Sequence, residues 1–129
     1  MSAMSDYLEN KVLDHVLGTT AYTHPSQTYI GLSTGSFADT GSGSSELSGN
    51  NYARVAINFD AASSDTTDNS AAVEFAAATG SWGSVSHFGL FDASSSGNLL
   101  IHGAFTAAKT ITTADILRIA AGELDVTAA

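Results

Sequence analysis

The chain of 129 residues lacks cysteine and has few basic side chains, and each shortage excludes a class of function. Without cysteine the chain has no disulfide bond, no thiolate zinc site and no cysteine nucleophile. Its four lysine and arginine residues offer little to neutralise phosphates, which is how proteins gain affinity for nucleic acid. Thirteen acidic residues give a formal net charge of −9, which also disfavours binding to an anionic membrane. We therefore expect no nucleic acid and no membrane among its partners.

Long apolar runs are missing too, yet the composition is that of a folded domain. No apolar run approaches the ~20 residues that span a bilayer. Hydrophobic residues make up 43% of the chain and charged residues 13%, a balance too apolar for a disordered segment. The length suits one hydrophobic core, so we predict a single domain over residues 1–129.

Residues 5–17 have the periodicity of an amphipathic helix. Ser5 or Asp6 can cap its start, and Glu9 follows Asp6 by three positions, as in a capping box. Gly18 suits the position just after the helix. The apolar positions form one stripe, made of Leu8, Val12, Leu13, Val16 and Leu17. We favour packing of this stripe on the domain's own sheet, and the alternative is docking on another subunit.

From residue 28 onward the periodicity is that of β-strands. The predicted strands cover residues 28–33, 52–59, 71–76, 85–91, 99–105, 116–119 and 124–126. Their inward positions predict a core of Ile30, Leu32, Val55, Ile57, Phe59, Val73, Phe75, Leu99, Ile101 and Phe105. Arg54, Ala56 and Asn58 are expected to point outward. The sequence thus predicts a mainly β fold, an antiparallel β-sandwich or jelly-roll-like domain over residues 28–127 behind one N-terminal α-helix.

No arrangement of residues predicts catalysis, so we expect no enzyme and assign no catalytic, cofactor-binding or metal-binding residues. Carboxylates are not paired as glycoside hydrolysis requires, and no serine, histidine and aspartate stand out as a triad. His87 and His102 could face each other across a hairpin, but they lack a third zinc ligand. Asp60, Asp65 and Asp68 could offer oxygen ligands to calcium, although a solvated loop is the favoured interpretation.

Aromatic residues and two long polar loops suggest binding rather than chemistry. Tyr29, Tyr52 and Trp82 could form an exposed platform for sugars, although packing beneath loops is the favoured interpretation. The loops at residues 36–51 and 60–69 are long enough to be functional.

Several segments, in order along nearly the whole chain, resemble a family of small tailed-bacteriophage virion proteins. They are residues 7–18 (YLENKVLDHVLG), 28–32 (TYIGL), 48–54 (SGNNYAR), 69–75 (NSAAVEF), 87–92 (HFGLFD) and 97–100 (GNLL). Members are labelled variously as tail-fibre, head-fibre or decoration proteins. The resemblance implies a structural protein of the virion, assembled in the host cytoplasm, and it carries no catalytic or ligand residues.

Within that family we expect a capsid decoration (cement) protein that stabilises the head as a homotrimer. Its partners would be the major capsid protein or other virion proteins, contacted by the two loops and the N-terminal helix. The alternative is a tail-fibre or tail-tip module that binds a host surface receptor or glycan. A depolymerase is disfavoured because paired acids are missing.

Overall fold

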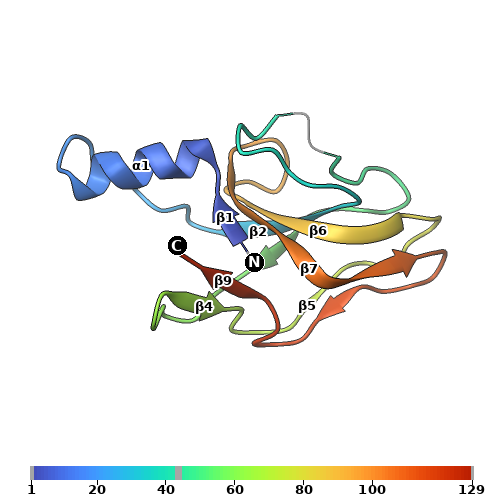
Figure 1. Ribbon diagram of the computed structural model, residues 1–129. Coiled ribbons are helices and arrows are strands. Elements are labelled where there is room, and N and C mark those ends of the chain that lie inside the picture. Colours follow the sequence, from blue (N-terminus) through green and yellow to red (C-terminus); the bar gives the residue numbers. More distant parts are fainter. Residues whose placement is uncertain (1, 43–44, 129) are drawn as a thin grey trace.

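The computed structural model describes residues 2–42 and 45–128, and it is mainly β, as the sequence predicted. These residues form nine strands and one helix, in the order β1 (Ser2–Met4), α1 (Asp6–Val16), β2 (Thr28–Ser33), β3 (Val55–Ile57), β4 (Thr66–Asp68), β5 (Val73–Glu74), β6 (Gly83–Phe91), β7 (Leu99–Ile111), β8 (Arg118–Ile119) and β9 (Asp125–Thr127). The strands gather in one body from which α1 projects (Figure 1).

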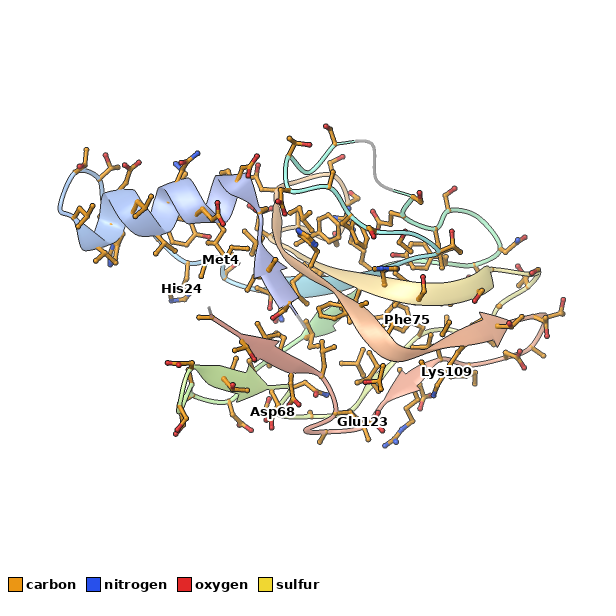
Figure 2. All side chains as sticks on the ribbon, viewed as in Figure 1. Met4, His24, Asp68, Phe75, Lys109 and Glu123 are labelled. Carbon is orange, nitrogen blue, oxygen red and sulfur yellow. The ribbon has the colours of Figure 1, made fainter. Side chains whose placement is uncertain are left out.

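The strands form two layers with the main hydrophobic core between them, and their pairing is antiparallel (Figure 1). One layer is a five-stranded sheet in the order β1-β7-β6-β2-β3. The other holds two separate two-stranded sheets, β4-β9 and β5-β8. Phe75, which follows β5, is 1% exposed and lies between the layers (Figure 2). The fold is therefore the predicted antiparallel sandwich.

The predicted core residues lie inside, and the alternation along each strand explains why. Five of the ten are buried in the main core, namely Ile30, Leu32, Ile57, Val73 and Phe75, whereas Leu99 is buried in a separate cluster and does not share the face of Ile101 and Phe105 as predicted. The other four, Val55, Phe59, Ile101 and Phe105, are partly buried against the same core. Further core residues come from β6 and the C-terminal segment, among them Val85, Phe88, Leu90, Leu117, Ile119, Leu124 and Val126.

Strand lengths differ from the prediction where a strand has no long partner. β2 has the predicted bounds, but β3 and β5 are shorter than their apolar runs. The structure also adds β1 and β4, two short strands that the sequence did not predict. β4 follows a tight turn in which Ser64 and Asp65 have positive φ angles of 52° and 68°. Ser63 and Thr66 exchange backbone hydrogen bonds around that turn, so the predicted loop at 60–69 is largely a hairpin.

The β6–β7 hairpin confirms the strongest predicted strand pair and contains a large bulge. Pairing shifts from Val85–Lys109 to His87–Ala104, so residues 105–108 lie opposite a single residue of β6. Bulges bend a strand and redirect its side chains. Here the bulge lets β7 extend to Ile111, beyond the predicted end, and turns part of it toward the second layer.

The outer face of the five-stranded sheet is covered by the segment between β2 and β3. Phe37 in that segment is 3% exposed and packs edge-on against Phe91, with ring centroids 5.8 Å apart. Leu99 completes this second, smaller core. The predicted loop at residues 36–51 is therefore partly packed on its own sheet rather than free to reach outward.

Helix α1 begins and ends close to the predicted bounds, but its environment differs from the favoured interpretation. Ser5 is the N-cap and its hydroxyl accepts from the Leu8 N–H at 3.3 Å, so Glu9 lies one position too late for a capping box. Gly18 follows the helix with a φ of 80°, as predicted. None of the helical residues is buried, and Leu17 at its end is 74% exposed. Packing of the whole apolar stripe on the domain's own sheet was wrong, because Leu8 and Val12 are half-buried but Leu13, Val16 and Leu17 are exposed.

Candidate functional surfaces

An ion pair that the sequence did not predict holds the β2–β3 segment against the sheet. The Arg54 guanidinium donates two hydrogen bonds to the Glu46 carboxylate, Nε to Oε2 and Nη2 to Oε1, each 2.8 Å long. The Tyr52 hydroxyl donates to the same Oε2 at 2.7 Å and accepts from the Leu32 N–H at 2.9 Å. The side chains of Arg54 and Glu46 are 8% and 19% exposed. A bidentate pair of this kind fixes geometry as well as charge.

Arg54 also connects this segment to the turn of the β6–β7 hairpin. Its Nη1 donates to the carbonyls of Ala93 at 2.9 Å and Ser96 at 2.8 Å. Its guanidinium carbon lies 3.5 Å from the centroid of the Phe91 ring. Arg54 points away from the main core, as predicted, but it is covered rather than exposed because the loop folds back over it. The role of this cluster is structural.

Trp82 and Tyr52 pack inside, as the favoured interpretation had it, so these aromatic residues do not form an exposed platform. Trp82 is 5% exposed, and its Nε1 donates to the Asn50 carbonyl at 2.9 Å. The Tyr52 ring lies edge-on to Trp82 with centroids 5.6 Å apart. Burial, reinforced by the hydrogen bond to Glu46, raises the pKa of the Tyr52 phenol well above its ordinary value. Tyr29 is half-buried on β2.

The two hairpin histidines are not cross-strand partners. His87 lies opposite Ala104, and His102 lies opposite Gly89, so the two are diagonal neighbours. The His102 Nε2 lies 2.6 Å from Oδ1 of Asp39. The His87 Nδ1 lies 2.7 Å from the Ser86 hydroxyl, and its Nε2 lies 3.3 Å from the Ser36 hydroxyl. Both rings therefore contact polar groups separately instead of forming a pair.

One serine motif escaped the sequence analysis, and its place in the fold differs from that of a hydrolase nucleophile. Gly31 to Gly35 has the spacing Gly-x-Ser-x-Gly of a hydrolase nucleophile elbow. Ser33 ends β2 instead of opening a helix, and it is fully buried. Its hydroxyl accepts from the Gly35 N–H at 3.1 Å. Such an elbow needs an exposed hydroxyl on a strand-to-helix turn, so this motif belongs to the strand end.

The predicted acidic loop does not gather its carboxylates. Asp68 lies on β4, Asp65 lies in the tight turn before it, and the backbone N–H of Asp60 donates to the Asp68 carbonyl at 3.0 Å. Within residues 2–42 and 45–128, no three acidic or histidine side chains are placed to hold one metal ion.

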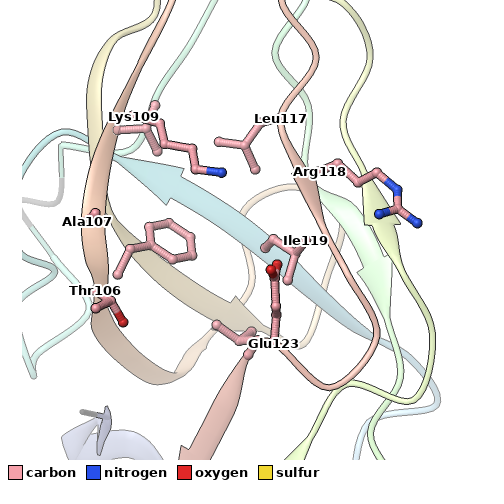
Figure 3. A pocket seen from close by; sticks show the side chains of 10 residues that line it. Thr106, Ala107, Lys109, Leu117, Arg118, Ile119 and Glu123 are labelled. Carbon is pink, nitrogen blue, oxygen red and sulfur yellow. The ribbon is translucent and has the colours of Figure 1, made fainter.

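The bulge in β7 opens a pocket of about 280 Å³ at the end of the sandwich. It is lined by Val85, Phe105, Thr106, Ala107, Lys109, Leu117, Arg118, Ile119, Glu123 and Leu124. Figure 3 shows Lys109 and Glu123 extending into the hollow from opposite walls, with Arg118 on the outer rim. The Glu123 carboxylate already accepts from the Ala120 N–H at 2.9 Å. The pocket has an apolar floor, the Lys109 ammonium and a Glu123 carboxylate that already accepts a hydrogen bond. This arrangement suits binding better than acid–base chemistry.

Comparison with known proteins agrees with the resemblance read from the sequence. The family model described as Podophage GP4 fiber I protein gp80 matches residues 3–127. The chain belongs to this family. The match covers α1 and both layers of the sandwich, so the Podophage GP4 fiber I protein gp80 family includes the helix as part of its pattern. Membership indicates a phage fibre protein and a place in the virion. No curated protein matches the chain.

The only helix in the described residues, α1, is too short to span a membrane.

Proposed function

We propose that this chain is a non-enzymatic structural protein of a podophage virion that serves in a fibre. The observation that carries the proposal is the family match over residues 3–127. It favours the fibre reading over capsid decoration, which the sequence analysis had placed first. Attachment to the major capsid protein or another virion protein, and assembly as a homotrimer, are parts of the same proposal.

The use of the polar side chains supports a structural role. Every buried side-chain nitrogen or oxygen in the described residues has a hydrogen-bond partner. Arg54, Glu46 and Tyr52 form one closed cluster, and His102 contacts Asp39. Catalytic groups need free capacity toward a substrate. In this chain Arg54, Glu46 and Asp39 hold loops on the sheet instead.

Binding of a host glycan by the chain itself receives no support from its aromatic residues. Tyr52 and Trp82 pack against each other and against Phe75. Sugar stacking would need their ring faces exposed. We therefore assign the chain to construction or attachment of the fibre rather than to receptor recognition.

The decisive experiment is electron microscopy of purified virions that carry a small affinity tag on this protein. Labelled density on fibres would support the proposal. Density repeated over the capsid lattice would establish decoration instead and overturn the fibre assignment. Absence of the protein from purified particles would overturn both. Sedimentation of the purified chain, whose mass is 13.1 kDa, tests the trimer independently.

A further inference from the structure

The end of α1 carries most of the large apolar side chains that the described surface exposes. Leu13, Val16 and Leu17 are 56%, 70% and 74% exposed. With 100° between successive residues of a helix, Asp6 and Glu9 lie on the same face, one to two turns before Leu13. This face is therefore acidic at its start, with Asp6 and Glu9, and apolar at its end, with Leu13, Val16 and Leu17. We name these five side chains together the helix tip.

The helix tip is anchored at both ends by hydrogen bonds, although Leu13, Val16 and Leu17 are largely exposed. At its start the backbone N–H of Ser5 donates to Leu100 at 2.8 Å, and that of Asp6 donates to Asp39 at 2.9 Å. At its end the N–H of Thr19 donates to the Asp14 carbonyl at 2.9 Å, and Tyr22 donates to His15 Nδ1 at 3.0 Å. An 11-residue helix is marginal by itself, so these anchors preserve a projecting element with an uncovered apolar end.

The pocket opened by the β7 bulge has the complementary properties. Its floor is apolar, with Phe105, Leu117 and Ile119 among its lining residues. Lys109 and Arg118 at this pocket are two of the four basic residues in the chain. Of the others, Arg54 is covered and Lys11 lies on α1 itself. No other described surface of this acidic protein is better placed to receive an acidic, apolar element.

Size and position favour a protein side chain over a small molecule as the occupant. At about 280 Å³ the pocket is slightly smaller than most ligand sites, which usually measure about 300–1,000 Å³. α1 projects from one end of the molecule, and the end of β7 lies toward the other (Figure 1). A contact between these two surfaces therefore joins different copies head to tail, which gives either a closed ring or an open filament.

We propose that the helix tip of one copy inserts into the β7 pocket of the next copy. Leu13, Val16 and Leu17 meet the apolar floor, and Glu9 meets the Lys109 ammonium inside the hollow. This inference deepens the proposed fibre function by naming the contact through which copies assemble. A ring of three copies and a longer fibre are both compatible with this single interface.

The test measures self-association of the purified full chain by sedimentation over a wide concentration range. Leu17→Glu should weaken association at least about tenfold, since it would bury an unpaired carboxylate against the apolar floor of the pocket. Ser95→Glu adds the same charge on an exposed turn between β6 and β7 and should leave association unchanged. Thermal melts of both variants should match the parent chain, because Leu17 supports no core.

A charge exchange then identifies the pocket. Glu9→Lys and Lys109→Glu should each weaken association, and the double variant should restore at least part of it. A chain that stays monomeric up to about millimolar concentration would overturn the inference. So would unchanged association of Leu17→Glu, or a double variant no better than the single ones. These readouts use purified protein, so absence from the virion would remove the proposed function while leaving this contact established.

Discussion

Replacing Arg54 with methionine tests whether the cluster beneath the β2–β3 segment holds the fold. Methionine keeps an apolar stem over Phe91 but removes both hydrogen bonds to Glu46. Breaking a buried ion pair from one side costs about 3–5 kcal/mol, because the remaining charge is left uncompensated. Glu46 is 19% exposed and keeps its hydrogen bond from Tyr52, so the lower end applies. We expect Arg54→Met to lower the free energy of unfolding by about 3 kcal/mol.

Urea unfolding at neutral pH measures this loss, and a double-mutant cycle assigns it to the pair. Glu46→Gln alone should also destabilise. Combined with Arg54→Met it should cost less than the sum of the two, with a coupling energy of about 1.5–3 kcal/mol. Arg118→Met is the matched control, because its contact with Glu74 spans 3.7 Å and both side chains are more than half exposed. It should change stability by less than about 0.5 kcal/mol.

Two results would refute the reasoning. A loss below about 1 kcal/mol for Arg54→Met would show that the ion pair contributes little beyond a surface pair. A coupling energy near zero would show that Arg54 acts through Ala93 and Ser96 rather than through Glu46.

Three further predictions follow from the same region and from the acidic hairpin. Gly31→Ala should destabilise by about 1–3 kcal/mol in urea, because an added Cβ would lie 2.7 Å from Oε2 of Glu46. Gly35→Ala, with its nearest atom at 3.6 Å, should be almost neutral, and equal effects of the two would contradict this account. Folding raises the pKa of the Tyr52 phenol, so the unfolded chain releases the phenol proton at a lower pH than the folded chain. The free energy of unfolding should therefore fall as pH rises above about 10, which urea midpoints measure, and Tyr52→Phe should make this fall smaller. EDTA should leave the melting temperature unchanged, and a drop of more than a few degrees would point to a cation site in the 60–68 hairpin.

Local patterns in the sequence were enough to predict the type of fold. Apolar positions spaced two residues apart identified β2 with its observed bounds and placed Ile57, Val73 and Phe75 in the core. Gly18 was identified as the residue that ends α1. These features depend on neighbours along the chain, since strand faces and helix ends follow from short-range geometry. The same segments carried the resemblance to the family that residues 3–127 match.

Contacts between distant segments decided the rest, and no local pattern contains them. The stripe on α1 showed which side of the helix is apolar. Amphipathicity does not say whether the surface that packs on that side belongs to the same chain or to another one. The alternation predicted that Arg54 is an exposed strand residue. In the structure the β2–β3 segment covers it and places the Glu46 carboxylate 2.8 Å from its guanidinium nitrogens. The position of His87 relative to His102 depended on the register of the β6–β7 hairpin, including an irregularity between Leu90 and Phe91 that alternation does not reveal. The bulge at residues 105–108 opens the pocket, so the surface proposed for assembly exists only in the tertiary structure.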